Sequence, residues 1–197
     1  MNQIQNFKRF LTYAGLDTKQ HQLEGVEWML DQEVNPKDTN NIGGICADEM
    51  GLGKTIQMLG LIVSNLKANT LIVLPVSLLV QWENEIKRTL GFQPLVYCGK
   101  EKHDINMELL NLSPITLTTY GQLTTDLCLL FNKNWDRVIY DEAHHLKNSN
   151  TRLWNIQSKL IKTYTWLVTG TPIHNSIRDV KNLFRLIGLK NIHKNYK

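Results

Sequence analysis

Residues 48–55 read DEMGLGKT, and they stand between two apolar stretches of the chain. The stretch that precedes them, IGGICAD at residues 42–48, has the length and composition of a buried strand. The stretch that follows them, residues 56–62, is interpreted as an apolar helix. Gly51 and Gly53 allow a loop whose backbone N–H groups point inward at an anion. We therefore expect a phosphate-binding loop between a strand and a helix.

The side chains of this loop suit a nucleoside triphosphate. Lys54 can reach the β- and γ-phosphates, the hydroxyl of Thr55 can be offered to Mg²⁺, and the following helix directs its positive dipole end at the anion. The usual first glycine of such a loop is Asp48 in this chain. A glycine-rich turn with an incidental lysine therefore stays an alternative on these residues alone. The residues assigned to the nucleotide here are Asp48, Met50, Gly51, Leu52, Gly53, Lys54 and Thr55.

A second apolar run, RVIYDEAHHL at residues 137–146, ends on adjacent carboxylates. Transfer of a phosphoryl group to water needs one carboxylate to hold Mg²⁺ and another to orient or deprotonate the water. We assign Asp141 to the metal, through an ordered water, and Glu142 to the attacking water. An acidic helix start is the alternative for the pair alone. Together with the phosphate loop, the pair predicts a nucleotide triphosphatase core.

Apolar runs alternate with amphipathic stretches along the whole chain. The runs interpreted as buried strands are residues 42–48, 70–75, 114–119, 137–141 and 165–170. The stretches with apolar residues at helical spacing are residues 23–34, 79–90 and 177–187, and residues 33–41 are the clearest loop. This alternation predicts an α/β domain with a mostly parallel central sheet, helices on both faces, and ligands at the carboxyl ends of the strands.

Length and composition narrow the class of protein. The 197 residues, 42% of them hydrophobic and 20% charged, suit one folded domain and exclude a disordered chain. Because no apolar run approaches about 18 residues and the first ten residues lack the apolar stretch of a signal peptide, we expect a soluble, intracellular protein of the nucleus or cytoplasm. The three scattered cysteines argue against a disulfide framework or a zinc site.

Positive charge collects in the second half of the chain. Ten Lys or Arg residues follow Glu142, against one acidic residue, Asp179. Solvated helix faces and a surface that faces a polyanion both explain this imbalance. For the basic stripe of Arg178, Lys181 and Arg185, we favour a solvated face. The five tryptophans lie in apolar patterns, which favours core packing over base stacking.

Three stretches resemble motifs I, II and III of the Swi/Snf-type ATPases, a branch of the superfamily-two helicases: DEMGLGKT at 48–55, DEAHHLKN at 141–148 and LVTGTPIHN at 167–175. Three more complete the order of the family. TKQHQLEGVEWM (18–29) is similar to the Q-motif region, LIVLPVSLLVQWENEIKR (71–88) to motif Ia, and ITLTTYGQL (115–123) to motif Ib. The resemblance covers nearly the whole chain and implies a single RecA-like P-loop domain at residues 1–197.

The resemblance also implies roles for residues at matching positions. Gln22 would read adenine, Lys54 and Thr55 would bind triphosphate and Mg²⁺, and Asp141 and Glu142 would bind Mg²⁺ and activate water. The residues implied in coupling nucleotide state to nucleic acid are His144, Thr169, Gly170 and Thr171. The residues implied in facing a nucleic-acid backbone are Pro75, Ser77, Thr118, Thr119 and Tyr120.

Four positions depart from the usual family pattern: Gln20, His21, His145 and His174. The first two replace basic, Pro and Tyr residues beside Gln22, and the last two replace Arg and Gln. We expect the adjacent side chains of His144 and His145 to point in different directions, which disfavours a transition-metal site there.

The resemblance implies the first lobe of an ATP-driven translocase on double-stranded DNA, with ATP and Mg²⁺ as cofactors and protein–DNA complexes as the objects that it remodels. In this family the arginine fingers come from a second RecA-like lobe, and nothing after motif III resembles the motifs of that lobe. We therefore expect weak or no turnover by the isolated chain, and a second lobe in the same native chain or in trans. A stand-alone nucleotide-, DNA- or partner-binding module is the alternative, and a small-molecule kinase is a weak third.

Overall fold

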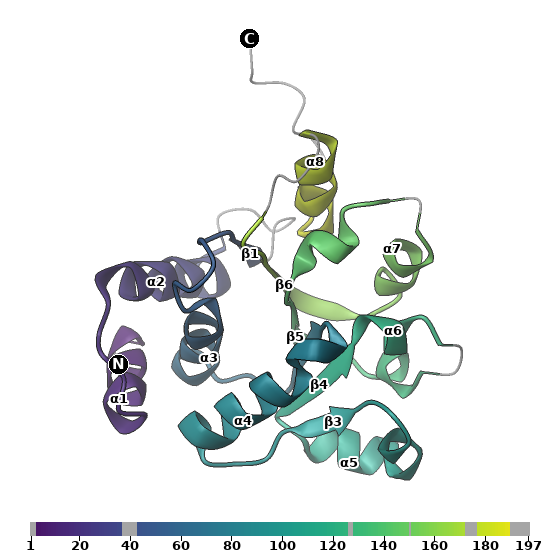
Figure 1. The fold of residues 1–197 in the computed structure, drawn as a ribbon, viewed down its shortest axis with the longest axis horizontal. Coiled ribbons are helices and arrows are strands. Elements are labelled where there is room, and N and C mark those ends of the chain that lie inside the picture. The colour runs from purple at the N-terminus through teal and green to yellow at the C-terminus, as the bar shows by residue number, and fades with distance from the viewer. Residues whose placement is uncertain (1–2, 37–42, 126–127, 150, 172–176, 190–197) are drawn as a thin grey trace.

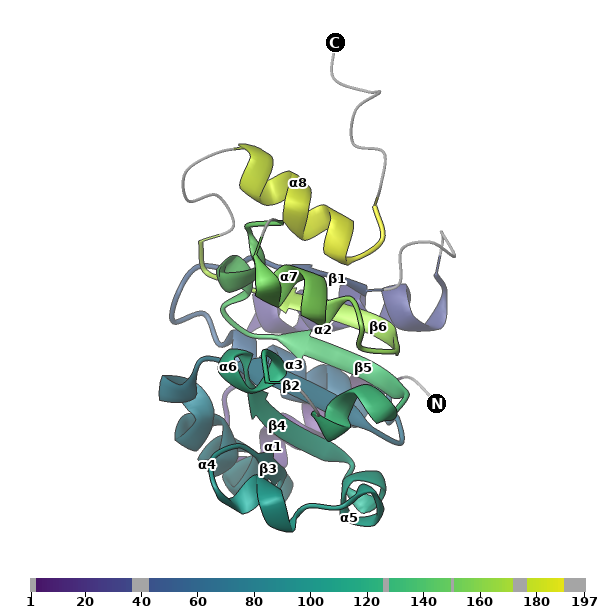
Figure 2. The ribbon, with the colours of Figure 1, turned by 90° about the vertical axis from the view of Figure 1, so that its right-hand side faces the viewer.

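A computed structural model describes residues 3–36, 43–125, 128–149, 151–171 and 177–189. Its strands form one sheet in the order β1-β6-β5-β2-β4-β3, and every neighbouring pair is parallel. The strands are β1 (Gly43–Cys46), β2 (Thr70–Leu74), β3 (Leu95–Tyr97), β4 (Ile115–Thr119), β5 (Trp135–Tyr140) and β6 (Lys162–Val168). Figure 2 shows them stacked in this order from β1 to β3. The predicted α/β class with a parallel sheet is confirmed.

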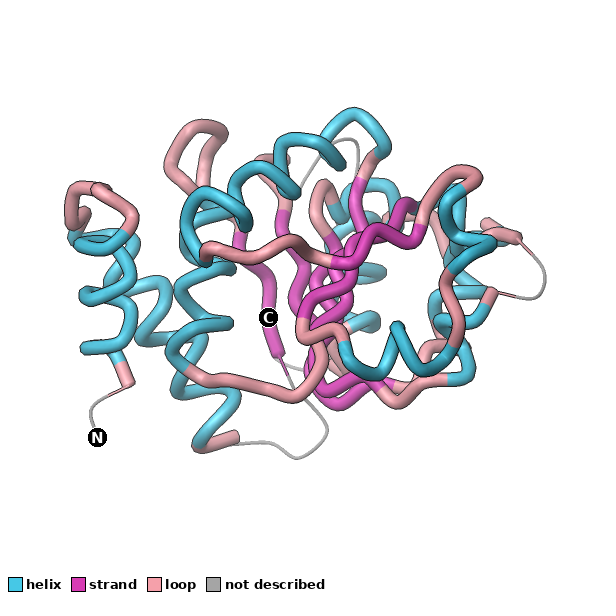
Figure 3. Tube along the Cα trace, turned by 90° about the horizontal axis from the view of Figure 1, so that it is seen from below, coloured by secondary structure: helices cyan, strands magenta, loops and turns pink. Residues whose placement is uncertain are grey.

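Helices cover both faces of the sheet (Figures 1 and 3). One face carries α1 (Ile4–Tyr13), α2 (Gln20–Val34), α3 (Lys54–Ser64) and α4 (Leu79–Leu90). The other face carries α5 (Met107–Leu112), α6 (Tyr120–Leu123), α7 (Arg152–Gln157) and α8 (Ile177–Leu186). Short 3₁₀ turns occur at η1 (Val76–Leu78), η2 (Glu101–Asp104), η3 (Leu129–Asn132) and η4 (Ala143–Leu146).

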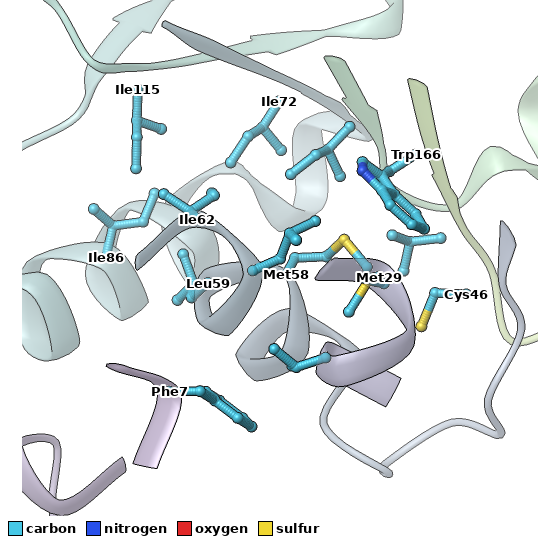
Figure 4. Close-up of a cluster of buried hydrophobic side chains, with 14 of the residues drawn as sticks. Phe7, Met29, Cys46, Met58, Leu59, Ile62, Ile72, Ile86, Ile115 and Trp166 are labelled. Atoms are coloured by element: carbon cyan, nitrogen blue, oxygen red, sulfur yellow. The ribbon is translucent and has the colours of Figure 1, made fainter. Parts of the chain in front are cut away.

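Two apolar clusters form the core, one on each face of the sheet. Strand β2 shows why, because its successive side chains point to opposite faces. Ile72 and Leu74 belong to the cluster under α1–α4, which Figure 4 shows in close-up, whereas Leu71 and Val73 belong to the cluster under α5–α8. A strand that is buried on both faces has to be apolar throughout, and this explains the continuous apolar runs of the sequence.

Five elements were not predicted: strand β3 and the helices α1, α5, α6 and α7. Strand β3 is three residues long and pairs with β4 at the edge of the sheet, and so short a run gives little periodic signal. Helix α1 buries Ile4, Phe7, Phe10 and Leu11, whose helical spacing could have predicted it. The predicted loop at 33–41 begins late, because α2 continues to Val34, and residues 37–42 lie outside the described residues.

The tryptophans mostly follow the packing prediction. Trp82, Trp135 and Trp166 are buried, and Trp154 is partly buried. Trp28 is 43% exposed, so the prediction of core packing is wrong for the outer part of this ring, although its edge contacts Trp166 at 5.4 Å between centroids. Among the described residues, no helix is both long and apolar enough to cross a bilayer.

Candidate nucleotide-binding site

The carboxyl ends of four neighbouring strands place the predicted motifs at one edge of the sheet. Residues 47–53 follow β1, residues 169–171 follow β6, residues 141–142 follow β5, and residues 75–78 follow β2. Because all of these strands are parallel, their carboxyl ends meet at the same edge. Segments more than 100 positions apart in the sequence, such as residues 47–53 and 169–171, therefore follow adjacent strands.

A pocket of about 430 Å³ opens at this edge. The phosphate loop and both motif II carboxylates line it, so Lys54, Asp141 and Glu142 face a common space. Helix α4 supplies another wall. The remaining lining residues include Gln81, Trp82, Glu85 and Arg88 of α4, with Leu16 ahead of α2.

The two loop glycines are required for different reasons. Both have left-handed backbones, with φ of +85° at Gly51 and +81° at Gly53. A Cβ at Gly53 would lie 2.3 Å from Nε2 of Gln22, whereas a Cβ at Gly51 would meet none of the described atoms within 4 Å. Gly51 therefore relieves backbone strain alone, and Gly53 also makes room for the side chain from α2.

Lys54 lies at the first position of α3 and reaches back over the loop. Its Nζ donates hydrogen bonds to the backbone carbonyls of Asp48 and Glu49, over 2.8 and 2.9 Å. An ammonium group has three donors, and both of these partners belong to the loop itself. Phosphate oxygens bound in the loop would compete with these two carbonyls for the ammonium group of Lys54.

Two Q-motif residues bind the backbone of the phosphate loop. Nε2 of Gln22 donates to the carbonyl of Leu52 over 3.0 Å, and the Gln22 side chain is buried. Nε2 of His21 lies 3.1 Å from the same oxygen, and since a carbonyl only accepts, this nitrogen must carry the ring proton. The Q motif is therefore hydrogen-bonded to the phosphate loop at Leu52, while the reading of adenine by Gln22 stays a prediction.

The Asp48 carboxylate turns toward α3. Its Oδ2 accepts a hydrogen bond from Nε2 of Gln57 over 2.6 Å. Gln57 is buried against α2, where a Cβ at Gly25 would lie 2.1 Å from the Gln57 Oε1 atom. The residue that departs from the usual loop pattern thus ties the start of the loop to two helices. Sequence reasoning did not single out Gln57, although its place three residues after Lys54 was a possible signal.

Asp141 is held by both of its carboxylate oxygens. Oδ1 accepts from the backbone N–H of Glu142 over 2.9 Å, and Oδ2 accepts from the indole N–H of Trp82 over 2.7 Å. Burial raises the pKa of this carboxyl, and the hydrogen bond from Trp82 opposes the shift most strongly. A carboxylate in such a place is ionised most easily when a cation shares the pocket.

Glu142 has an unusual backbone. It is the non-glycine residue with positive φ among those described, at +50°, a conformation that costs a non-glycine residue about 1–2 kcal/mol. Its Oε2 lies 3.1 Å from Nδ1 of His144, and this nitrogen is buried without a hydrogen-bond partner among the described residues. Strain of this kind gathers at functional sites, where the surrounding structure enforces it.

The two motif II histidines lie together. The ring centroids of His144 and His145 are 4.6 Å apart and the planes differ by 28°, so the expectation that these side chains diverge is wrong. The His145 ring also lies 5.1 Å from that of Tyr120. Burial, and then the neighbouring His144, lower the pKa of His145, which favours its neutral form.

Motif III contacts the phosphate loop directly. The backbone N–H of Thr169 donates to the carbonyl of Cys46 over 3.1 Å, and the Thr169 hydroxyl accepts from the N–H of Thr171 over 3.2 Å. A Cβ at Gly170 would lie 2.8 Å from Cγ of Met50. Gly170 therefore packs against Met50 of the phosphate loop, so a displacement of residues 169–171 would change this contact. His174 lies outside the described residues.

The residues predicted to face nucleic acid fall into two groups. Ser77 is exposed and Pro75 is half-buried, both at the surface turn after β2. The hydroxyl of Thr118 is buried and donates to the carbonyl of Tyr97 over 2.9 Å, and the hydroxyl of Thr119 accepts from the N–H of Gln122, which caps α6.

Tyr120 is buried as well, and its hydroxyl donates to the backbone carbonyl of Asp141 over 2.7 Å. The described contacts of these three motif Ib residues are therefore structural ones. Nucleic-acid contact stays a prediction for the whole set, and among its members the exposed Ser77 offers its hydroxyl to a phosphate most directly.

Comparison with known proteins gives one family. The model of the SNF2-related domain matches residues 21–196. A probable ATP-dependent helicase of Plasmodium falciparum is 35% identical over 86% of this chain and 8% of its own length. An uncharacterized ATP-dependent helicase of Schizosaccharomyces pombe is 35% identical over 91% of this chain and 20% of its own length. The nuclear protein STH1/NPS1 of Saccharomyces cerevisiae is 31% identical over 88% of this chain and 13% of its own length.

A solved structure resembles the fold and the sequence together. The SWI2/SNF2 ATPase core of Sulfolobus solfataricus, in complex with double-stranded DNA, superposes with a TM-score of 0.73 at 27% identity. The match covers 85% of this chain and 35% of that one. The chain thus spans a fifth or less of the length of the curated relatives named above and about a third of the solved core.

Proposed function

The chain belongs to the SNF2-related domain family, and on that premise we propose that it is the nucleotide-binding lobe of an ATP-dependent translocase on duplex DNA. The observation that carries this proposal is a pocket that phosphate-loop residues line together with Asp141 and Glu142. Its named relatives support the use of ATP, and the DNA complex of the Sulfolobus core supports duplex DNA as the partner. Remodelling of protein–DNA complexes, in the nucleus or cytoplasm, is the task that we propose.

The residues present fit Mg²⁺ and a triphosphate. Thr55 and Asp141 line the same pocket and offer hard oxygen donors, which Mg²⁺ prefers, together with phosphate oxygens and water. Bound there, Mg²⁺ would neutralise charge on the phosphates. Lys54 would hold the terminal phosphates, and Glu142 would orient the attacking water and accept its proton.

We propose a second RecA-like lobe as the partner that completes the site, in the same native chain or in trans. An arginine supplied by such a lobe adds on the order of 10³–10⁵ in rate by stabilising charge on the transferred phosphoryl group. The 35% coverage of the Sulfolobus core supports this arrangement. Turnover by the 197-residue chain alone is then weak or absent.

A test of nucleotide binding separates this proposal from an incidental glycine-rich turn. We expect ATP and Mg²⁺ to raise the melting temperature of the chain, and Lys54→Ala to abolish that rise because the phosphates lose their charged partner. Lys8→Ala, at an exposed position of α1, is the matched control. Unchanged ATP affinity in Lys54→Ala would remove the phosphate-loop assignment.

A test of turnover separates the motor lobe from a non-catalytic binding module. The ATPase rate of the chain is measured with and without duplex DNA, and then with a candidate second lobe added. We expect turnover only in the two-lobed mixture, stimulated by DNA and lost in Glu142→Gln with ATP binding kept. DNA-stimulated turnover by the single chain would contradict catalytic incompleteness.

A further inference from the structure

Trp82 connects α4 to the carboxylate of motif II. It lies on the buried face of α4 with 1% of its surface exposed, and its indole N–H donates to Oδ2 of Asp141 over 2.7 Å. The two residues are 59 positions apart in the chain, and both line the pocket. A hydrogen bond from a neutral donor to an ionised acceptor is short and strong, as this one is.

The remaining polar atoms of Asp141 have partners too. Its backbone N–H donates to the carbonyl of Val73, over 2.8 Å, and its own carbonyl accepts from the hydroxyl of Tyr120. Oδ1 accepts from the N–H of Glu142. Val73, Tyr120 and Glu142 thus fix the main chain and one oxygen, and Trp82 fixes the other oxygen.

This arrangement determines what Asp141 can offer to the pocket. An ionised carboxylate has about four lone-pair directions, and the two hydrogen bonds to it occupy one on each oxygen. The free directions are then set by the donors, so the plane of the carboxylate cannot turn without breaking a bond. Trp82 is a buried ring on a helix of 12 residues, so packing of the indole against its neighbours holds this donor in place.

We propose that Trp82 is a positioning residue, which orients the Asp141 carboxylate for the divalent cation that accompanies the nucleotide. This proposal depends on the metal role given to Asp141 under the proposed function. Groups that orient a metal ligand typically contribute 10–100-fold to metal affinity without touching the metal. A residue of motif Ia is thereby part of the metal site built by motifs I and II.

The test compares Trp82→Phe with Trp135→Phe. Both tryptophans are 1% exposed and each donates its indole N–H, but Trp135 bonds to the carbonyl of Leu130 on the other face of the sheet. ATP binding to the whole 197-residue chain is titrated calorimetrically without metal and over a range of Mg²⁺ concentrations. Both variants lose packing and a hydrogen bond, so a loss of stability alone cannot distinguish them.

We expect Trp82→Phe to keep its metal-free ATP affinity and to need about tenfold more Mg²⁺ for the same strengthening of binding. Trp135→Phe should match the wild type both in its metal-free ATP affinity and in the Mg²⁺ concentration that it needs. A Trp82→Phe variant with wild-type Mg²⁺ dependence would overturn the role of Trp82 alone. Wild-type ATP binding that Mg²⁺ does not strengthen would overturn the metal role of Asp141, and the role of Trp82 with it.

A second measurement needs no change at Trp82. In ¹⁵N-labelled protein, the indole N–H signal of Trp82 is compared between the wild type and Asp141→Asn. We expect that signal to move and its hydrogen exchange to accelerate, because a neutral amide oxygen accepts less strongly than a carboxylate. The indole signal of Trp135 should stay where it is. An unmoved Trp82 signal would show that the hydrogen bond does not form in solution and would overturn the proposal.

Discussion

Glu33 on α2 and Arg137 on β5 form a fully buried ion pair, in which Nε of Arg137 donates to Oε1 of Glu33 over 2.7 Å. The other oxygen of Glu33 accepts from Nδ2 of Asn65, and Oε1 also accepts from the indole of Trp166. Arg137 lies near the amino end of its strand, so the pair sits at the edge of the sheet opposite to the pocket. The pair links α2 and the end of α3 to β5, because Glu33 also accepts from Asn65 and Arg137 donates to the Asn65 carbonyl.

Glu33→Gln should therefore destabilise the fold strongly and directly. Removing one partner leaves the guanidinium of Arg137 buried without a counter-charge, which costs about 3–5 kcal/mol. Urea unfolding followed by circular dichroism measures the loss. Glu85→Gln is the matched control, since its pair with Arg88 is partly exposed, and about 0–1 kcal/mol is expected there. Equal losses in both variants would contradict the burial argument.

The two loop glycines give a paired prediction. Gly51→Ala adds only the strain of a left-handed backbone, about 1–2 kcal/mol. Gly53→Ala adds that strain and forces the Gln22 amide away from its bond to Leu52. We expect Gly53→Ala to lower both the stability and the ATP affinity more than Gly51→Ala does, measured by thermal unfolding and by calorimetry. The reverse order would mean that Gly51 approaches the nucleotide more closely than the loop geometry indicates.

Tyr120→Phe tests the internal role of motif Ib. The change removes the hydroxyl that donates to the Asp141 carbonyl and leaves that oxygen buried without this donor, at a cost of about 1–3 kcal/mol. Urea unfolding measures it. Tyr13→Phe, at a side chain 76% exposed, is the control and should leave stability unchanged. If the two variants are equally stable, the buried hydroxyl has no structural part.

Much of this site was predictable because the signals are local and periodic. Apolar runs that end in polar residues predict parallel strands, and parallel strands bring Lys54 and Asp141 to one edge whatever their exact register. The bond from Trp82 was not predictable, since it depends on how α4 is rotated about its axis. The same holds for Thr118 and Tyr120, because sequence places them at a strand end but does not say which way their hydroxyls turn.

Burial of Lys162 gives a prediction about pH. This lysine begins β6, its Nζ donates to the carbonyl and to Oε1 of Gln157, and burial lowers its pKa from 10.5 to about 8. The folded state therefore favours the neutral amine, while the unfolded chain keeps its proton up to about pH 10.5. The unfolded state binds more protons between pH 8 and 10.5, so this group stabilises the fold as pH rises through that window.

The expected observation is a difference between two proteins. From pH 8 to 10.5, the unfolding free energy of the wild type should rise relative to that of Lys162→Met, by at most about 1.4 kcal/mol per pH unit. Comparing the two proteins at each pH removes the contributions of other titrating groups. A difference that stays constant across this window would mean that the Lys162 ammonium is solvated.

Asp48 provides the last prediction, because it occupies the first position of the phosphate loop. Its carboxylate accepts from Gln57, and an amide oxygen can still accept that bond, although less strongly than a carboxylate does. We therefore expect Asp48→Asn to keep most of the ATP affinity of the wild type, because the link from the start of the loop to Gln57 on α3 is retained. Asp48→Ala should weaken binding, because the loop loses its link to α3. If the two variants weaken ATP binding equally, the charge of Asp48 matters and not its hydrogen bond to Gln57.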